Sequence, residues 1–187
     1  MHGAELVSSR SWQDRTTSCA LVACVFALAW GLKSFYSRAG FEDLRWILAP
    51  TRWLVERLTG AAFEPEAHQG YLSRDRLYQI APACAGVNFM IVAFASLACG
   101  LVHTCSTLRG RMALLVASAF AAYAVTVLAN ATRIALAMRL HDARTAFGPL
   151  TPERLHCAEG VTVYFVFLCV LFAAGARLTG ARHEFAL

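Results

Sequence analysis

Four long stretches without a charged residue constrain this chain most. They cover Thr16–Leu32, Leu77–Leu108, Met112–Thr132 and Gly160–Ala176. About 20 mainly apolar residues are enough for a helix to cross a bilayer, and the chain as a whole is 58% apolar and only 16% charged. These runs exclude a disordered chain, a fibre and an ordinary water-soluble enzyme. They predict an all-α integral membrane protein, with residues 1–187 forming a single polytopic domain.

About four transmembrane helices are expected, at residues 16–36, 83–102, 112–131 and 157–176. The first of them has an alternative interpretation, because Ala27, Leu28 and Ala29 form a small-x-small pattern after an apolar stretch of signal-peptide length. A cleaved signal peptide is that alternative. The bulky Trp30 just after this pattern, and the apolar sequence that continues to Tyr36, favour a retained helix.

The segments between the spans predict amphipathic helices at the membrane interface. Phe41–Leu58 alternates apolar residues with tryptophans and arginines, which predicts a pair of interfacial helices broken at Pro50. Glu64–Arg76 is expected to be a polar loop, and Ile134–Leu140 an interfacial continuation of the third span. Thr151–Glu153 has the features of a helix start, since Thr can cap, Pro suits the first turn and an acid complements the dipole.

The basic residues predict contact with membrane lipid. The chain has 17 Lys and Arg against 12 Asp and Glu, Lys33 is its one lysine, and the arginines lie beside apolar segments instead of in one block. Snorkelling toward headgroups explains this placement better than a nucleic-acid surface, so no nucleic-acid partner is expected. The short basic loop Cys105–Arg111 and the basic C-terminal tail are assigned to the cytoplasm by the positive-inside rule, with both termini inside.

The seven cysteines do not form a recognisable framework. No C-x-x-C motif occurs, and four of the cysteines lie inside apolar runs, where cysteine acts as a small hydrophobe. No helix carries two His or Cys ligands at helical spacing near one face, so neither a metal nor another cofactor is expected. Cys84, which begins the second span, is the cysteine of interest.

The order of the spans places three chemically distinct groups at one face of the membrane. Cys84 begins the second span, Arg133 ends the third, and His156 precedes the fourth. After Pro82, in a first helical turn, unpaired N–H groups and the positive end of the helix dipole favour a thiolate nucleophile at Cys84. His156 can act as general base and acid, and Arg133 can stabilise an oxyanion.

Each of these residues also has a structural interpretation. Cys84 lies in a run of small residues where packing is the commoner role, Arg133 can anchor a helix end to headgroups, and His156 can cap a helix or face solvent. Glu153 and Glu159, three residues on either side of His156, are candidates for orienting its ring. Asn88, one turn after Cys84, is expected to form an interhelical hydrogen bond, as polar residues in spans often do. Taken one at a time, these residues do not decide between catalysis and packing.

The local sequences around the three groups resemble the exosortase/archaeosortase family of membrane-embedded cysteine transpeptidases. Ala83-Cys84-Ala85-Gly86 is similar to the family's Cys box, with Ala85 in place of the usual serine. Asn130-Ala131-Thr132-Arg133 matches its N-x-x-R box, and His156 with Gly160 matches its histidine box. The resemblance covers roughly residues 80–176, and the chain is closest in size to the compact exosortase K type.

The resemblance implies a sorting enzyme of the bacterial inner membrane with its active site on the extracytoplasmic face. Its substrates would be exported proteins that end in a short motif, a transmembrane helix and a basic cluster. Cys84 would be the nucleophile, His156 the acid and base, and Arg133 the oxyanion-stabilising or substrate-orienting group. The acceptor nucleophile is not implied, and the Ala85 departure weakens any assignment of subfamily and substrate.

Two other classes of function remain alternatives at this point. A membrane thiol oxidoreductase would use Cys84 and Cys157, which are expected on the same face, although the absence of C-x-x-C argues against it. A non-catalytic transport or assembly subunit would tolerate substitution of Cys84, Arg133 and His156 as well as that of their neighbours.

Overall fold

The computed structural model describes residues 2–75, 78–142 and 152–180, and the side chains of residues 16–75, 78–141 and 157–180. Its helices are α1 (His2–Tyr36), α2 (Arg45–Thr59), α3 (Val87–Leu101), α4 (Leu108–Asp142) and α5 (Pro152–Leu178). Its strands are β1 (Glu64–Glu66), β2 (Gly70–Ser73) and β3 (Tyr78–Ile80), and 3-10 turns cover Glu42–Leu44, Pro82–Cys84 and Val102–Thr104.

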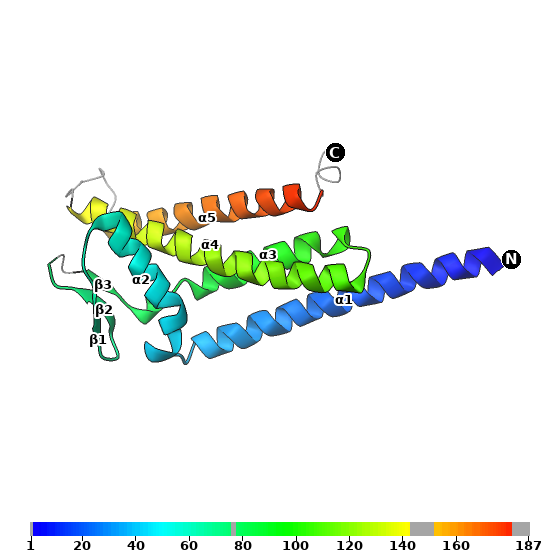
Figure 1. The fold of residues 1–187 in the computed structure, drawn as a ribbon, viewed down its shortest axis with the longest axis horizontal. Helices are drawn as coiled ribbons and strands as arrows, with labels where there is room; N and C mark the ends of the chain where they lie inside the picture. The colour runs from blue at the N-terminus through cyan, green and yellow to red at the C-terminus, as the bar shows by residue number, and fades with distance from the viewer. Residues whose placement is uncertain (1, 76–77, 143–151, 181–187) are drawn as a thin grey trace.

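Four of the described helical segments are long and apolar enough to cross a membrane, which confirms the predicted fold class. They are Thr16–Tyr36, Pro82–Thr104, Leu108–His141 and Cys157–Leu178. Figure 1 shows α3, α4 and α5 running side by side, whereas α1 lies along one side of the bundle and extends beyond it. The protein is therefore a multi-pass membrane protein.

Small residues let α5 approach α3 closely. A Cβ added at Gly100 would lie 2.6 Å from the ring of Phe172, and one added at Gly175 would lie 2.8 Å from the side chain of Leu97. Spanning helices gain much of their association from close van der Waals packing, because lipid offers no hydrophobic drive between them. These two glycines therefore explain why α5 packs on α3 although most of its surface faces outward.

The predicted break at Pro50 is wrong, because α2 continues through this proline as one helix. Proline has no N–H to donate, so the carbonyl of Trp46, four residues earlier, loses its helical partner. The hydroxyl of Tyr123 in α4 donates to that carbonyl at 2.8 Å, and its ring stacks on Trp46. α2 therefore stays intact because α4 supplies the missing hydrogen bond.

The predicted amphipathic character of α2 is confirmed. Its buried residues are Ile47, Leu48, Thr51 and Val55, whereas Trp46 and Trp53 are exposed.

The predicted polar loop at Glu64–Arg76 is also wrong, because a three-stranded antiparallel sheet begins there. Leu72 of β2 faces Glu64 of β1 on one side and Gln79 of β3 on the other. The buried Tyr71 packs edge-on against Phe41, with ring centroids 5.1 Å apart. Charged residues and a proline normally count against a strand, and strands this short carry too little alternation to outweigh them.

α4 continues without interruption over Ile134–Leu140, so this segment forms the last turns of the spanning helix instead of a separate interfacial one. Ile134 and Met138 are buried there, and Arg139 donates to the carbonyl of Leu58 in α2 at 3.2 Å. The expected helix start at Thr151 and the loop before it lie outside the described residues, and α5 begins at Pro152.

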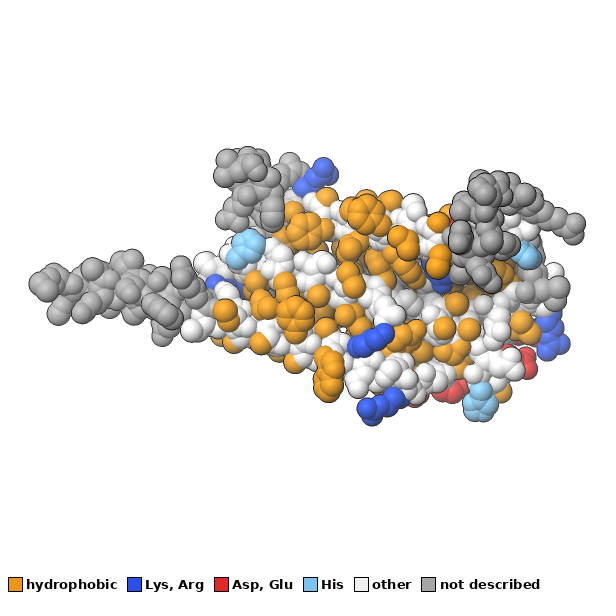
Figure 2. Space-filling model, turned by 180° about the vertical axis from the view of Figure 1, so that it is seen from behind, with side chains coloured by type: hydrophobic (Ala, Val, Ile, Leu, Met, Phe, Trp, Pro, Cys, Tyr) orange, Lys and Arg blue, Asp and Glu red, His pale blue; other side chains and the backbone are white. Residues whose placement is uncertain are grey.

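The acidic side chains divide the molecule into two unlike ends. Every described Asp and Glu side chain belongs to residues 42–75 or is Glu159, and Figure 2 shows those visible on its face toward the end that carries the sheet. The α3–α4 connection, defined here as residues 102–111 so that it includes the first turn of α4, lies at the other end. It carries Arg109 and Arg111 and no acid. The sheet end is called the site end below, because Cys84 and Arg133 lie there.

Candidate active site

Cys84 lies in the tight connection between the sheet and α3. Ala81 ends the extended segment with φ −78° and ψ 162°, and Pro82 then begins the 3-10 turn that closes at Cys84. The N–H of Cys84 donates to the carbonyl of Ala81 at 2.8 Å. Cys84 therefore precedes α3 by a turn, and its own N–H is engaged in that turn. As predicted, it lies in the first turn of the candidate span Pro82–Thr104, but this turn is a 3-10 turn that comes before α3 itself. Its side chain is half-buried.

Gly86 fixes the path from this turn into α3. Its φ of +72° lies in the left-handed region, which only glycine adopts readily. A Cβ at this position would also meet Thr126 at 3.2 Å and Asn130 and Tyr164 at 3.4 Å. Glycine is required here both for backbone conformation and for the close approach of α4 and α5 to the Cys84 turn.

Asn130 is the centre of the polar network at the site. Its side chain is fully buried on α4, and its Nδ2 donates to the carbonyl of Cys84. Its Oδ1 accepts a hydrogen bond from the Tyr164 hydroxyl at 2.9 Å and weaker ones from Arg133, at 3.3 Å from Nη2 and 3.4 Å from Nε. One asparagine thus links the Cys84 turn, α4 and α5, and a buried polar group needs such partners to be stable.

Arg133 lies one turn after Asn130, with its guanidinium beside the thiol. The Arg133 guanidinium lies close enough to the side chains of Cys84 and Tyr164 to interact electrostatically with both. Its guanidinium carbon lies 5.8 Å from the centre of the Tyr164 ring, and that ring stacks on Phe89 with centroids 4.7 Å apart. The predicted proximity of Cys84 and Arg133 is therefore present in the structure. The guanidinium is held by an aromatic ring and an amide at fixed positions.

Tyr78 of β3 adds a second hydroxyl to the site. Burial raises the pKa of Tyr78, the Cys84 side chain raises it further, and the positive charge of Arg133 lowers it, while Glu159 raises it. Tyrosine is protonated at neutral pH even at its ordinary pKa, so the Tyr78 hydroxyl can donate a hydrogen bond. The same interactions show that strand β3, the Cys84 turn, α4 and α5 meet in one small region.

α1 supports the Cys84 turn from the other side. The Tyr36 hydroxyl donates to the carbonyl of Ala83 at 3.3 Å, and Lys33 donates to Oδ1 of Asn88 at 2.7 Å. The second contact joins α1 to α3, which confirms the predicted interhelical role of Asn88. The turn that carries Cys84 is thus held by side chains from α1 and α4.

The side chain of His156 lies outside the described residues, as does that of Glu153. The backbone of His156 belongs to α5, one helical turn before Gly160. A Cβ at Gly160 would lie 3.5 Å from Cδ of Arg133, so this part of α5 passes directly over the Arg133 stem. The buried Glu159 lies on the same stretch. The helix that carries His156 therefore reaches the site, and contact of its ring with Cys84 stays a prediction.

Three residues of this site are not predicted from the sequence, or are predicted only in part. Asn130 was noted only as part of a motif, and Tyr78 and Tyr164 were not singled out. Tyr164 lies within an apolar run, where an aromatic residue normally predicts packing. Its position one turn after Gly160 is the signal that could have indicated it, because a buried Tyr hydroxyl usually finds a hydrogen-bond partner.

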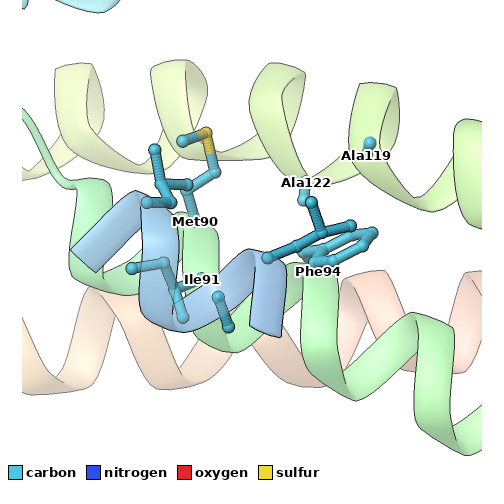
Figure 3. Close-up of a pocket in the computed structure, with 8 residues that line it drawn as sticks. Met90, Ile91, Phe94, Ala119 and Ala122 are labelled. Atoms are coloured by element: carbon cyan, nitrogen blue, oxygen red, sulfur yellow. The ribbon is translucent and has the colours of Figure 1, made fainter. Parts of the chain in front are cut away.

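An apolar cavity lies on the membrane side of the site. It has a volume of about 260 Å³ and is lined by Leu28, Ala29 and Leu32 of α1, Met90, Ile91 and Phe94 of α3, and Ala119 and Ala122 of α4. Figure 3 shows Met90, Ile91 and Phe94 projecting from α3 toward the cavity, with Ala119 and Ala122 behind them. All the lining side chains are apolar, which suits a hydrocarbon environment.

Two further observations concern the thiols and acidic groups of the described residues. Among their side chains, no group of three His, Cys, Asp or Glu could hold a metal ion. Cys84 and Cys157 are both free thiols, and Cys157 is exposed on α5. The described side chains that interact with Cys84 include Arg133, Tyr78 and Tyr36.

Comparison of the chain with models of protein families, with curated proteins and with solved structures finds no match.

Proposed function

We propose that this protein is a membrane-embedded cysteine peptidase or transpeptidase of the kind that its Cys, N-x-x-R and His motifs resemble. The observation that carries the proposal is the contact of Arg133 with the Cys84 side chain. The carbonyl of Cys84 accepts a hydrogen bond from Asn130, whereas the interaction of Arg133 with Cys84 involves the side chain. A cysteine whose role was only packing would need no buried network of this kind.

The first step forms a thioester. The Cys84 sulfur attacks the carbonyl carbon of the scissile peptide bond, and a C–S bond forms while negative charge develops on the carbonyl oxygen. Arg133 stabilises this oxyanion with its fixed N–H donors, a type of interaction that is among the largest contributions to acyl-transfer catalysis. The C–N bond then breaks, and His156 in its acid form gives a proton to the leaving amine.

The second step releases the new carboxyl end of the substrate. An acceptor nucleophile, either an amine or water, attacks the thioester carbon and passes its proton to His156. The C–S bond breaks and regenerates the Cys84 thiolate. Covalent catalysis of this kind divides one difficult acyl transfer into two easier ones. The substrate would be the C-terminal region of an exported protein: a short motif, a transmembrane helix and a basic tail.

The site end would face the extracytoplasmic side of a bacterial inner membrane. The basic α3–α4 connection at the opposite end supports this orientation, because cytoplasmic loops carry an excess of Lys and Arg. An exported substrate would then be held in the bilayer by its own helix, with its cleavage motif at the level of Cys84. The site requires no metal or organic cofactor for this chemistry.

The test is the processing of a tagged exported protein from the source genome that ends in a short motif, an apolar helix and an Arg-rich tail. We expect membranes that contain the wild-type protein to cleave it, and Cys84→Ala to abolish cleavage, because the acyl-enzyme route then no longer exists. Cys99→Ala and Cys169→Ala, which change thiols on the same helical bundle, are the matched controls and should process normally.

Two results would overturn the proposal. Near-full processing by Cys84→Ala, at equal amounts of inserted protein, would remove the cysteine mechanism. A fall in the number of free thiols from seven to five in the native protein, restored by reductant, would favour the oxidoreductase alternative. A Cys84-linked thioester that hydroxylamine releases is the expected intermediate.

A further inference from the structure

Strand β3 forms an edge of the sheet, and it leads directly into the Cys84 turn. The strand order is β1-β2-β3, so within the described part of the chain β3 has β2 on one side and no strand on the other. An edge strand presents unpaired N–H and C=O groups to any extended chain beside it. The register of the strands determines which of these groups face outward.

Pro65 decides this question through the register of the sheet. Directly opposite residues of an antiparallel pair either exchange both backbone hydrogen bonds or exchange none. Pro65 faces Tyr71 and has no N–H, so that pair cannot exchange bonds and Tyr71 must bond toward β3 instead. On β3 its partner is Ile80. Ile80 therefore bonds to β2, as does Tyr78, two residues earlier.

The backbone groups of Gln79 consequently point away from β2. Alternation along the extended chain gives the N–H of Ala81 the same direction, since Ala81 keeps extended dihedral angles. The Gln79 side chain is not directed to this edge, because it donates to the carbonyl of Gln69 at 2.8 Å. The edge thus offers the N–H and C=O of Gln79 and the N–H of Ala81, spaced about 7 Å apart as residues i and i+2 of a strand.

This edge is continuous with the proposed site. Ala81 is three residues before Cys84 and accepts the hydrogen bond that closes the Cys84 turn. The side chain of Tyr78, which shares the strand, interacts with the charges of Cys84 and Arg133. A chain that paired with Gln79 and Ala81 would therefore pass beside the Cys84 sulfur within a few residues.

We infer that the Gln79–Ala81 edge binds the extended segment of the substrate that carries the scissile bond, as an added fourth strand. This inference rests on the proposed function, because an extended peptide is the occupant that a peptide-cleaving site requires. Backbone pairing gives affinity that depends little on side chains, and the neighbouring pockets then supply specificity. The edge is a binding element, whereas Cys84 and Arg133 act on the bond itself.

The first experiment compares Gln79→Pro with Gln79→Ala in the full-length protein. Gln79→Pro removes the outward N–H and is compatible with an edge position whose N–H faces away from the sheet. Gln79→Ala loses the contact to Gln69 but keeps the backbone donor. With the tagged substrate, we expect Gln79→Pro to raise KM about 2- to 12-fold with kcat nearly unchanged, the loss that one hydrogen bond typically causes. Gln79→Ala should change KM less than 2-fold.

The second experiment leaves the protein unchanged and alters the substrate. In a series of synthetic substrates, each amide before the scissile bond is replaced in turn by an ester, which has no N–H. We expect KM to rise at alternate positions, because only every second residue of an added strand bonds to β3. A flat response along the series, together with a wild-type KM for Gln79→Pro, would overturn the inference.

The two proposals fail in different ways. If cleavage of the tagged substrate does not depend on Cys84, the proposed function fails and the inference fails with it. If cleavage depends on Cys84 while both the proline variant and the ester series leave KM unchanged, the function stands and only strand addition is wrong. Thermal unfolding of Gln79→Pro separates a damaged sheet from a lost substrate contact, and the ester series decides the case if the sheet is damaged.

Discussion

The two ends of the helical bundle carry the same three residue types, but these residues are connected to the fold in different ways. The site end has a cysteine, an arginine and a histidine, and so does the connection between α3 and α4. The first set is Cys84, Arg133 and His156, and the second is Cys105, Arg111 and His103. Composition alone cannot separate them.

The arginines at the two ends form different contacts. At the α3–α4 connection, Nε of the buried Arg111 donates to the carbonyl of Cys105 at 2.9 Å, so the guanidinium holds the backbone of its own loop. At the site end, the carbonyl of Cys84 is taken by Asn130, which is 46 residues away in the sequence. Arg133 is therefore available to the Cys84 side chain.

The two sets of residues also differ in how much of the fold must form before their members come together. The second set lies in a single segment of nine residues, from His103 to Arg111, so local folding is enough to bring its members together. The first set requires α3, α4 and α5 to pack, with a left-handed glycine and a buried asparagine at their meeting point. Ordering so many groups costs conformational entropy. The local structure of the α3–α4 connection orders fewer groups, and its entropic cost is smaller.

The largest expected difference between the ends is the compartment that each one faces. A reporter that is active only outside the cytoplasm should give no signal when fused after Gly110 and full signal when fused after Gly148. The two points follow successive crossings of the membrane in a four-span protein. Identical signals from both fusions would contradict this comparison, because Cys84 and Cys105 would then face the same side of the membrane.

The next largest effect is expected for the two histidines. His156→Ala should lower the rate of substrate cleavage by about 10²–10⁴-fold, the usual contribution of general acid–base catalysis. It should also remove the dependence of the remaining rate on pH around 6.5, the ordinary imidazole pKa. His103→Ala is the control at the opposite end and should leave both rate and pH profile unchanged. Equal losses in the two variants would contradict the assignment of roles.

The arginines should give a smaller but sharper contrast. Arg133→Lys keeps the charge and loses the planar fork, so we expect a rate loss of about 10²–10³-fold, as for one oxyanion donor. Arg111→Lys should leave the rate unchanged and lower the free energy of unfolding by about 1 kcal/mol through its weakened backbone hydrogen bond. Cleavage by Arg133→Lys at the wild-type rate would return this residue to the role of a headgroup anchor.

The sequence predicts the spans well because hydropathy acts over 20 residues and is independent of neighbours. The amphipathic face of α2 is predicted for the same reason, but its continuity is not, since the hydrogen bond that compensates for Pro50 comes from Tyr123 on another helix. The sheet is not predicted because its short, charged strands give little local signal, and Tyr71 packs against Phe41, a residue distant in the chain. Predictions failed where the decisive contact is distant in the chain.

The candidate site also contains some features that the sequence predicts and others that depend on contacts distant in the chain. Cys84 and Arg133 are found from sequence because span ends alternate between faces, which brings them to one side whatever the packing. The turn that holds Cys84 is not predicted, because it depends on the sheet before it. Tyr164 is not predicted either, since its hydroxyl has a partner only after α4 and α5 have packed around Asn130.

The smallest expected effect concerns Tyr164, and it distinguishes a positioning role from a structural one. Tyr164→Phe removes the hydroxyl that donates to Asn130 at 2.9 Å and keeps the ring that stacks on Phe89 and lies under Arg133. Arg133 still donates to the same Asn130 oxygen, so the network loosens without collapsing. We expect kcat to fall about 2- to 12-fold and the free energy of unfolding to fall by about 0.5–1.5 kcal/mol, the value of one hydrogen bond.

Tyr123→Phe is the matched control, because it removes a tyrosine hydroxyl that donates to Trp46 at 2.8 Å away from the site. Its loss of stability should be similar, since the kind of hydrogen bond is the same, and its kcat should equal that of the wild type. Parallel measurements of kcat and thermal unfolding on both variants decide the matter. If kcat follows stability equally in the two, Tyr164 only holds the helices together; if kcat falls in Tyr164→Phe alone, its hydroxyl positions Asn130 and Arg133 for the reaction at Cys84.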